Sequence, residues 1–214
     1  MGLFGHSTSQ SVLLEPFHPP IGLNAAFCMP HVETLVMKEK MWSFSGDDFS
    51  IQNSAGQDVV RCHGQAFSWR DRKEFKDARQ MPLFTVRNKV LAFHKTQLIE
   101  AMDGTDLCTV KKKFSIGSSR MIASFHNLAS ANASSSSHDL IELECKGDWF
   151  DRSAIITLLG TERVVGQISR KILNMREVIG GQQTYAVTIA PGVDVALMAA
   201  LCVCFDEAFN ESQN

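Results

Sequence analysis

The sequence has no apolar segment long enough to cross a lipid bilayer. Its main apolar run, residues 193–205, contains thirteen residues of which twelve are apolar. As a helix it would extend about 20 Å, whereas a bilayer core is about 30 Å thick. Residues 1–17 also lack the basic and apolar regions of a secretory signal peptide. These absences predict a cytoplasmic protein with reduced cysteines and no transmembrane segment.

Motifs for catalysis and for metal binding are missing as well. There is no G-x-S-x-G, P-loop or H-E-x-x-H sequence, and the seven histidines lack ligand spacing. The six cysteines include no C-x-x-C pair. Cys62 and His63 are adjacent, so on a strand they would face opposite sides and could not form a nucleophile–base pair. We expect a non-catalytic protein without metal or cofactor, although a site assembled across strands would leave no motif.

The apolar run at residues 193–205 gives the clearest indication of the fold. A helix that is apolar on all sides must be surrounded by protein. Asp194 lies in its first turn, where a carboxylate favours the positive end of the helix dipole, so we predict a capping role. Asp206 and Glu207 follow the apolar run and are expected to emerge into water. The helix residues predicted to fill the core are Val193, Leu197, Met198, Leu201 and Phe205.

The chain before this helix is divided into short β-rich segments by turn residues. Segments such as residues 164–169 and 184–189 recur at spacings of 8–15 residues, and no long amphipathic helix interrupts them. About a dozen such strands predict a closed β-sheet around the C-terminal helix. We divide the chain into a flexible leader at 1–30, one barrel domain at 31–209 with a Ser-rich loop at 129–138, and a polar tail at 210–214.

Positive charge is concentrated in one third of the chain. Residues 61–120 hold 13 Lys and Arg against 6 Asp and Glu, although the net charge of the whole chain is −2. Such asymmetry is typical of an anion-binding face, but mixed charges such as Asp71, Glu74 and Asp77 equally fit a salt-bridged surface. In a strand, Lys111 and Lys113 would share one side and Lys112 the other. The candidate ligand-binding residues are Arg70, Arg72, Lys73, Lys76, Arg79, Lys111 and Lys113.

Two parts of the sequence resemble a known family. Residues 83–96 and 107–113 resemble the central signature of LURP-one-related proteins, and residues 185–194, with Pro-Gly-Val-Asp before the helix, resemble their C-terminal signature. The resemblance implies the Tubby C-terminal-like fold, in which twelve antiparallel strands close around a hydrophobic C-terminal helix. It also implies kinship with Tubby-like proteins, whose basic side chains bind phosphoinositide headgroups, and with phospholipid scramblases. Kinship of fold is only an associational argument for function.

Charge and resemblance together lead to a functional hypothesis. We expect a monomeric, non-catalytic binding module that attaches peripherally to anionic phospholipid headgroups, phosphoinositides among them, through its basic face. The alternative is a structural or signalling adaptor that binds a protein partner and no lipid. Nucleic acid is a poor candidate because the aromatic residues of 61–120 fall at core-like strand positions and the overall charge is negative.

Overall fold

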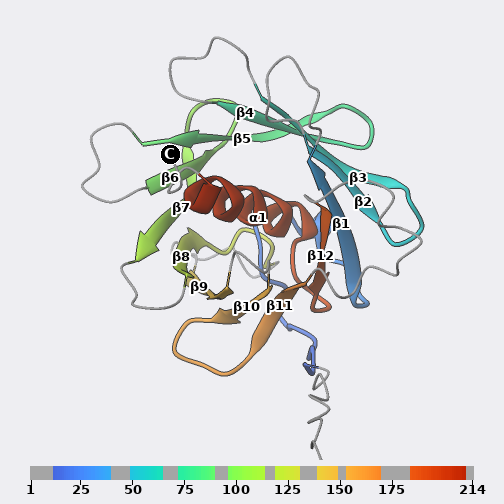
Figure 1. Cartoon of the computed structure of the whole chain (residues 1–214), viewed down its shortest axis with the longest axis vertical. Coiled ribbons are helices and arrows are strands. Elements are labelled where there is room, and N and C mark those ends of the chain that lie inside the picture. The colour runs from blue at the N-terminus through green and yellow to red at the C-terminus, as the bar shows by residue number, and fades with distance from the viewer. Residues whose placement is uncertain are drawn as a thin grey trace, which may run out of the picture.

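The protein is a closed antiparallel β-barrel of twelve strands with one α-helix along its centre (Figure 1). Consecutive strands pair with each other, and β12 pairs with β1 to close the barrel. The structure is a computed structural model that describes residues 12–39, 49–64, 72–89, 96–113, 119–130, 139–148, 153–169 and 184–210. The elements are a 3-10 turn at Ala25–Phe27, β1 (Glu33–Glu39), β2 (Phe49–Asn53), β3 (Asp58–Gly64), β4 (Lys73–Asp77), β5 (Pro82–Asn88), β6 (Thr96–Glu100), β7 (Asp106–Lys113), β8 (Ser119–His126), β9 (Leu140–Asp148), β10 (Ser153–Leu158), β11 (Val164–Ser169), β12 (Thr184–Ile189) and α1 (Val195–Asn210).

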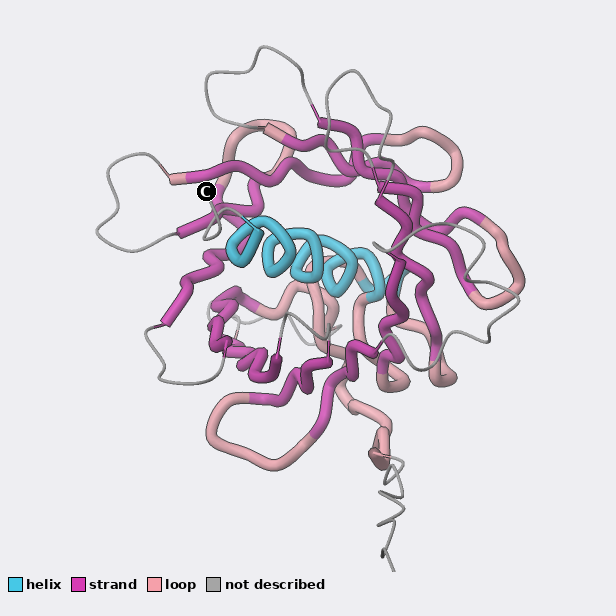
Figure 2. Tube along the Cα trace, in the orientation of Figure 1, coloured by secondary structure: helices cyan, strands magenta, loops and turns pink. Residues whose placement is uncertain are grey.

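The predicted all-β architecture with one buried helix is confirmed. Every residue of α1 from Val195 to Phe205 is at most 1 % exposed, as is Val193 just before it. Figure 2 shows the helix enclosed by the ring of strands. Alternate residues of the strands face the helix, as in β7, where Cys108 and Val110 are buried between exposed or half-buried neighbours. Among the described residues, no helix is long and apolar enough to span a bilayer.

One strand was not predicted. Residues 73–77, which form β4, were interpreted as part of a charged surface because Lys73, Glu74, Lys76 and Asp77 surround a single phenylalanine. In the barrel, Phe75 is fully buried, and the centroid of its ring lies 5.1 Å from the ring centroid of Phe84 on β5. The side chains of Glu74 and Lys76 alternate with the buried ones. One aromatic contact with a neighbouring strand therefore decides the conformation of a segment that is mostly charged.

Asp194 caps the helix, as predicted, and also attaches the N-terminal segment to it. Its Oδ1 accepts hydrogen bonds from the backbone N–H groups of Ala196 (2.9 Å) and Leu197 (3.0 Å) at the start of α1. Its Oδ2 accepts from the N–H groups of Leu23 (3.0 Å) and Asn24 (2.9 Å). Burial raises the pKa of the Asp194 carboxyl, and the four N–H donors act in the opposite direction.

The expected flexible leader does not extend through residues 17–28. Phe17 is buried and its N–H donates to Pro191 O (2.9 Å), while Ile21 N–H donates to Gly192 O (2.9 Å). Gly192 has a φ of 79°, and a Cβ there would lie 2.3 Å from Phe17 O, so glycine is required at this contact. Two apolar residues among prolines and glycines carry no periodicity, so this packing could not be predicted from the sequence.

The C-terminal end of α1 is polar and largely enclosed, in contrast to the prediction that Asp206 and Glu207 emerge into water. Asp206 is 2 % exposed, and Glu207 forms an ion pair with the buried Lys73 of β4. Lys112 of β7 points inward and its Nζ donates to Ala208 O (3.0 Å). The barrel is thus longer than the apolar part of the helix. Inward-facing lysines complement the negative end of the helix dipole there.

Candidate anion-binding site

The structure separates the basic residues that the sequence grouped together. Lys73 faces the barrel interior and is 2 % exposed, so it does not belong to an exposed set. Lys76 forms an ion pair with Glu74 across 3.2 Å on the same strand. Arg79 is exposed in the β4–β5 turn, at the end of the barrel where α1 begins, whereas Lys113 ends β7 at the opposite end. Arg70 lies outside the described residues.

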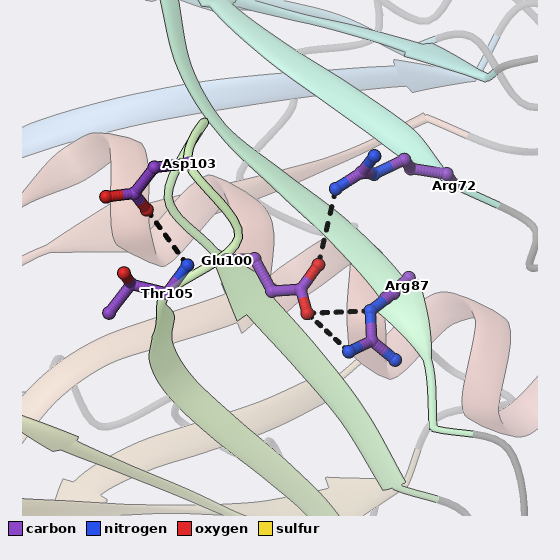
Figure 3. A network of polar contacts seen from close by, with 5 residues as sticks. All are labelled: Arg72, Arg87, Glu100, Asp103 and Thr105. Carbon is purple, nitrogen blue, oxygen red and sulfur yellow. Dashed lines mark hydrogen bonds and ion pairs between the residues drawn. The ribbon is translucent and has the colours of Figure 1, made fainter.

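Arg72 is held by a carboxylate on the barrel wall. Glu100 of β6 accepts a hydrogen bond from Arg72 Nη2 through Oε2 (3.3 Å) and one from Arg87 Nε through Oε1 (2.7 Å), as Figure 3 shows. The Glu100 side chain is only 5 % exposed. Hydrogen bonding to Arg87 is the main cause that lowers the pKa of Glu100 below its ordinary value. The Arg72–Glu100–Arg87 cluster is therefore a structural ion-pair network.

This network predicts an acid-sensitive contribution to stability. The pKa of Glu100 is lower in the folded protein, so its ionised carboxylate stabilises the folded state. This stabilisation is fully present above the ordinary pKa of 4.5 and is lost as the pH falls through the folded-state pKa. We expect Glu100→Gln to lower the free energy of unfolding at pH 7 by about 1–2 kcal/mol and to weaken its acid dependence. Urea unfolding at several pH values between 7 and 3 measures both the free energy of unfolding at pH 7 and its dependence on pH. The exposed Glu162→Gln controls for the lost charge, and an equal effect there would exclude a specific role for Glu100.

Lys111 and Lys113 are the predicted residues that remain available on the outer wall. Both are exposed on β7, while Lys112 between them points inward to α1, which confirms the predicted alternation. No ion pair links either lysine to another residue of the described chain. Whether the two lysines act together with other cations depends on which side chains the neighbouring strands place beside them.

Strand register places two further cations beside Lys113. Lys113 on β7 is the direct partner of Arg120 on β8, and Arg120 is the direct partner of Lys146 on β9. Direct partners on one face have Cβ atoms about 5 Å apart, and like charges in that arrangement repel. We call Lys113, Arg120 and Lys146 the cation row. Among the described residues, the cation row forms one ion pair, between Arg120 and Glu144, and Lys113 and Lys146 are exposed.

Sequence reasoning missed Arg120 and Lys146. Arg120 is an isolated cation in the sequence, and Lys146 lies outside the basic region 61–120, near the end of β9. The signal that could have found them is pairing of consecutive strands, because a β7–β8–β9 meander with outward Lys113 brings outward residues of β8 and β9 alongside. The residue-by-residue pairing of β7, β8 and β9 could not be predicted without the geometry of the hairpins that connect them.

The fold and the site define a closed β-barrel, filled by its own C-terminal helix, with a row of cations on its outer wall. Within the described residues no group of three or more His, Cys, Asp or Glu side chains could hold a metal ion. The model of the LURP-one-related family matches residues 33–206, from the first strand into the helix. The chain therefore belongs to the LURP-one-related family.

Individual relatives agree with this assignment. Protein LURP-one-related 15 from Arabidopsis thaliana is 25% identical over 195 residues, which cover 87% of this chain and 85% of the relative. Protein LURP-one-related 10 from the same plant is 24% identical over 188 residues, covering 86% and 94%. An X-ray structure of an Arabidopsis thaliana protein superimposes with a TM-score of 0.59 at 19% identity, covering 86% of this chain and 96% of that one. At this identity the structural likeness supports the fold alone.

Proposed function

We propose that this protein is a non-catalytic binding module that attaches to anionic phospholipid headgroups, phosphoinositides included, through the outer wall of β7, β8 and β9. The observation that supports this most directly is the cation row with Lys111 beside it. Four cations on this wall face outward together with three carboxylates, Asp106, Glu142 and Glu144, which leaves a balance of +1 among the side chains that the structure describes. Three of the thirteen Lys and Arg residues of 61–120, Lys111, Lys113 and Arg120, face outward on this wall.

The chemistry of the wall suits phosphate. Multiply charged phosphates are bound by several converging Lys and Arg side chains, and Arg presents parallel N–H donors to their oxygens. Adjacent strands are about 4.8 Å apart, so the three positions of the row span about 10 Å. A rigid barrel holds these positions at fixed spacing. The repulsion among aligned cations is relieved when an anion binds, which is the physical reason for such a row.

The module would act at the surface of a membrane. Anionic lipids attract basic groups by about 1 kcal/mol for each Lys or Arg near the surface, and the attraction weakens with salt. We place the protein in the cytoplasm as a peripheral, monomeric protein that contacts the bilayer with this wall.

Charge reversal in the cation row tests the proposal. We expect Lys113→Glu with Lys146→Glu to weaken co-sedimentation with phosphoinositide-containing phosphatidylcholine vesicles at least about tenfold, because two attractions become two repulsions. The matched control is Arg79→Glu with Lys89→Glu, which changes the net charge equally at exposed positions outside β7–β9. Binding is measured at low and at physiological salt, and both variants should unfold at the wild-type temperature.

Two results would contradict the proposal in different ways. An equal loss in the Arg79 and Lys89 control would mean that only overall charge matters and that the wall has no special role. If the wild-type protein binds no vesicle even at low salt, where surface electrostatics are strongest, the lipid-binding function is wrong. In that case the protein-binding adaptor becomes the leading hypothesis.

A further inference from the structure

An apolar pocket of about 110 Å³ lies at the end of the barrel where α1 begins. Its apolar lining comes from the N-terminal segment, from two strands and from the first turn of α1, and consists of Leu23, Phe27, Leu83, Phe84, Leu107 and Ala196. Leu83 and Leu107 are only half-buried, so part of this lining is in contact with water. An apolar cavity of roughly 150 Å³ holds a benzene molecule, so this pocket suits a single aliphatic side chain. We call it the end pocket.

Two exposed methionines border the end pocket. Met81 is 61% exposed and lies in the β4–β5 turn, two residues before Leu83, while Met102 is 51% exposed and lies in the β6–β7 turn that leads to Leu107. Because β5 pairs with β6, these two turns are neighbours at this end of the barrel. Exposed methionines are typical of surfaces that adapt to an apolar partner. The pocket and the methionines together provide both a cavity and an adaptable border.

Hydrogen bonds within the turns fix the backbone that carries the methionines. Asp77 Oδ1 accepts the N–H groups of Arg79 and Met81, both at 2.8 Å. In the β6–β7 turn, Asp103 Oδ1 accepts the N–H of Thr105 (2.9 Å). A ligand that binds here therefore meets a surface that is already formed, and little free energy is lost in ordering it.

The charge around the end pocket is negative. Residues 77–81 and 101–106 together hold three Asp and one Arg, a balance of −2. In the part of the chain that the structure describes, the exposed acidic residues all lie at this end of the barrel, with two exposed arginines: Glu15, Asp103, Asp106, Asp139 and Glu162, against Arg79 and Arg163. An apolar pocket with an acidic border complements a ligand that is both apolar and basic, and it disfavours an acidic one.

We infer that the end pocket is a docking site for a basic amphipathic segment of a partner protein. One aliphatic side chain of the segment enters the pocket beside Leu83, and its Lys or Arg side chains face Asp103 and Asp106. This site is separate from the proposed lipid-binding surface, because the cation row lies toward the opposite end of the barrel, where β7 ends with Lys113. Attachment of the row to a bilayer thus leaves the end pocket accessible to the partner.

A model peptide tests this inference without any vesicle. The probe is a fluorescein-labelled amphipathic peptide with leucines on one helical face and lysines on the other, and fluorescence anisotropy measures its binding to the full chain. We expect Leu83→Gln to weaken binding about tenfold or more, because an apolar contact in the pocket is lost. The control is Leu140→Gln, which makes the same change at an exposed leucine at the start of β9 and should leave binding unchanged.

The acidic border is tested with a second pair of variants. Asp103→Asn with Asp106→Asn should weaken binding about fivefold, because two attractions at the border of the pocket are removed. Asparagine keeps a side-chain oxygen that can accept the Thr105 N–H. The control, Asp139→Asn with Glu162→Gln, changes the net charge equally at exposed positions in other connections of the same barrel end, and little effect is expected there.

Two altered peptides complete the design. A peptide with serine in place of leucine should bind weakly, and equally to the wild type and to Leu83→Gln, even if that substitution lowers the unfolding temperature. A peptide with glutamate in place of lysine should not bind. If Leu83→Gln weakens both the leucine and the serine peptides by the same factor, no leucine enters the pocket and the inference is wrong.

Three further results would also overturn the inference. Wild-type protein that does not bind the leucine–lysine peptide has no such docking site. Equal losses in the two carboxylate pairs would show that only overall charge attracts the peptide. Binding of the glutamate peptide as strong as that of the lysine peptide would exclude a basic partner. Because no lipid is present, each of these results leaves the proposed lipid binding to be judged by its own experiment.

Discussion

Leu201→Asp is expected to prevent the barrel from folding. Leu201 is fully buried in the middle of α1, which packs against β1, β3, β7 and β8. The substitution removes an apolar side chain, at about 2–5 kcal/mol, and introduces a carboxylate that must lose its hydration or take up a proton. We expect the free energy of unfolding to fall by about 5 kcal/mol or more, which is comparable to the whole stability of a typical domain.

Circular dichroism and thermal unfolding measure this effect directly. The control is Leu140→Asp, which makes the same chemical change at a leucine that is 60% exposed on β9. This variant should unfold within a few degrees of the wild type, because surface substitutions usually change stability by less than about 0.5 kcal/mol. A Leu201→Asp protein with a native spectrum and unfolding temperature would mean that α1 lies outside the barrel in solution.

Asp194→Ala should produce the second largest loss of stability. The carboxylate accepts four backbone N–H groups, two from the first turn of α1 and two from Leu23 and Asn24 of the N-terminal segment. Loss of a helix cap costs about 1 kcal/mol, and each buried N–H left without a partner adds to this. We expect a decrease of about 3–5 kcal/mol in the free energy of unfolding by urea.

The design of this test separates capping from attachment of the N-terminal segment. Asp194→Asn keeps one acceptor oxygen, so it should retain about half of the stabilisation by satisfying one pair of donors. Asp103→Ala removes an aspartate that accepts the Thr105 N–H (2.9 Å) in the exposed β6–β7 turn. Little change is expected there, because water can replace the lost acceptor. If Asp103→Ala and Asp194→Ala lowered the free energy of unfolding equally, burial of the Asp194 carboxylate with its four N–H donors would contribute nothing specific to stability.

Most of the architecture could be predicted because its causes are local. The apolar run of α1 must be buried, and turn residues divide the remaining chain into segments of strand length. Residues 164–169 and 184–189 were predicted with the bounds that β11 and β12 have. Alternation along a strand also placed Lys111 and Lys113 on one side and Lys112 on the other. The Pro-Gly-Val-Asp motif agreed with the family that the comparison established.

Other features depend on contacts between distant parts of the chain. Phe17 and Ile21 are buried against the turn that precedes α1, and Lys73 pairs with Glu207, more than a hundred residues away in the sequence. A charged residue can lie in a segment of any conformation, so composition alone could not distinguish the inward Lys73 from an exposed lysine. Buried charges are normally paired, so the burial of Lys73 could be inferred only once its partner was known.

The sequence by itself determined the class of fold, the family and the presence of excess positive charge in residues 61–120. Hydrophobic periodicity and turn chemistry act over a few residues, so they can be followed along the chain. The tertiary structure alone decided which cations lie together, because strand register aligns Lys113 with Arg120 and Lys146 and places Glu144 beside them. Register depends on hairpin geometry and on the match of buried faces across strands, and a shift by one residue would turn these side chains to the other face of the wall.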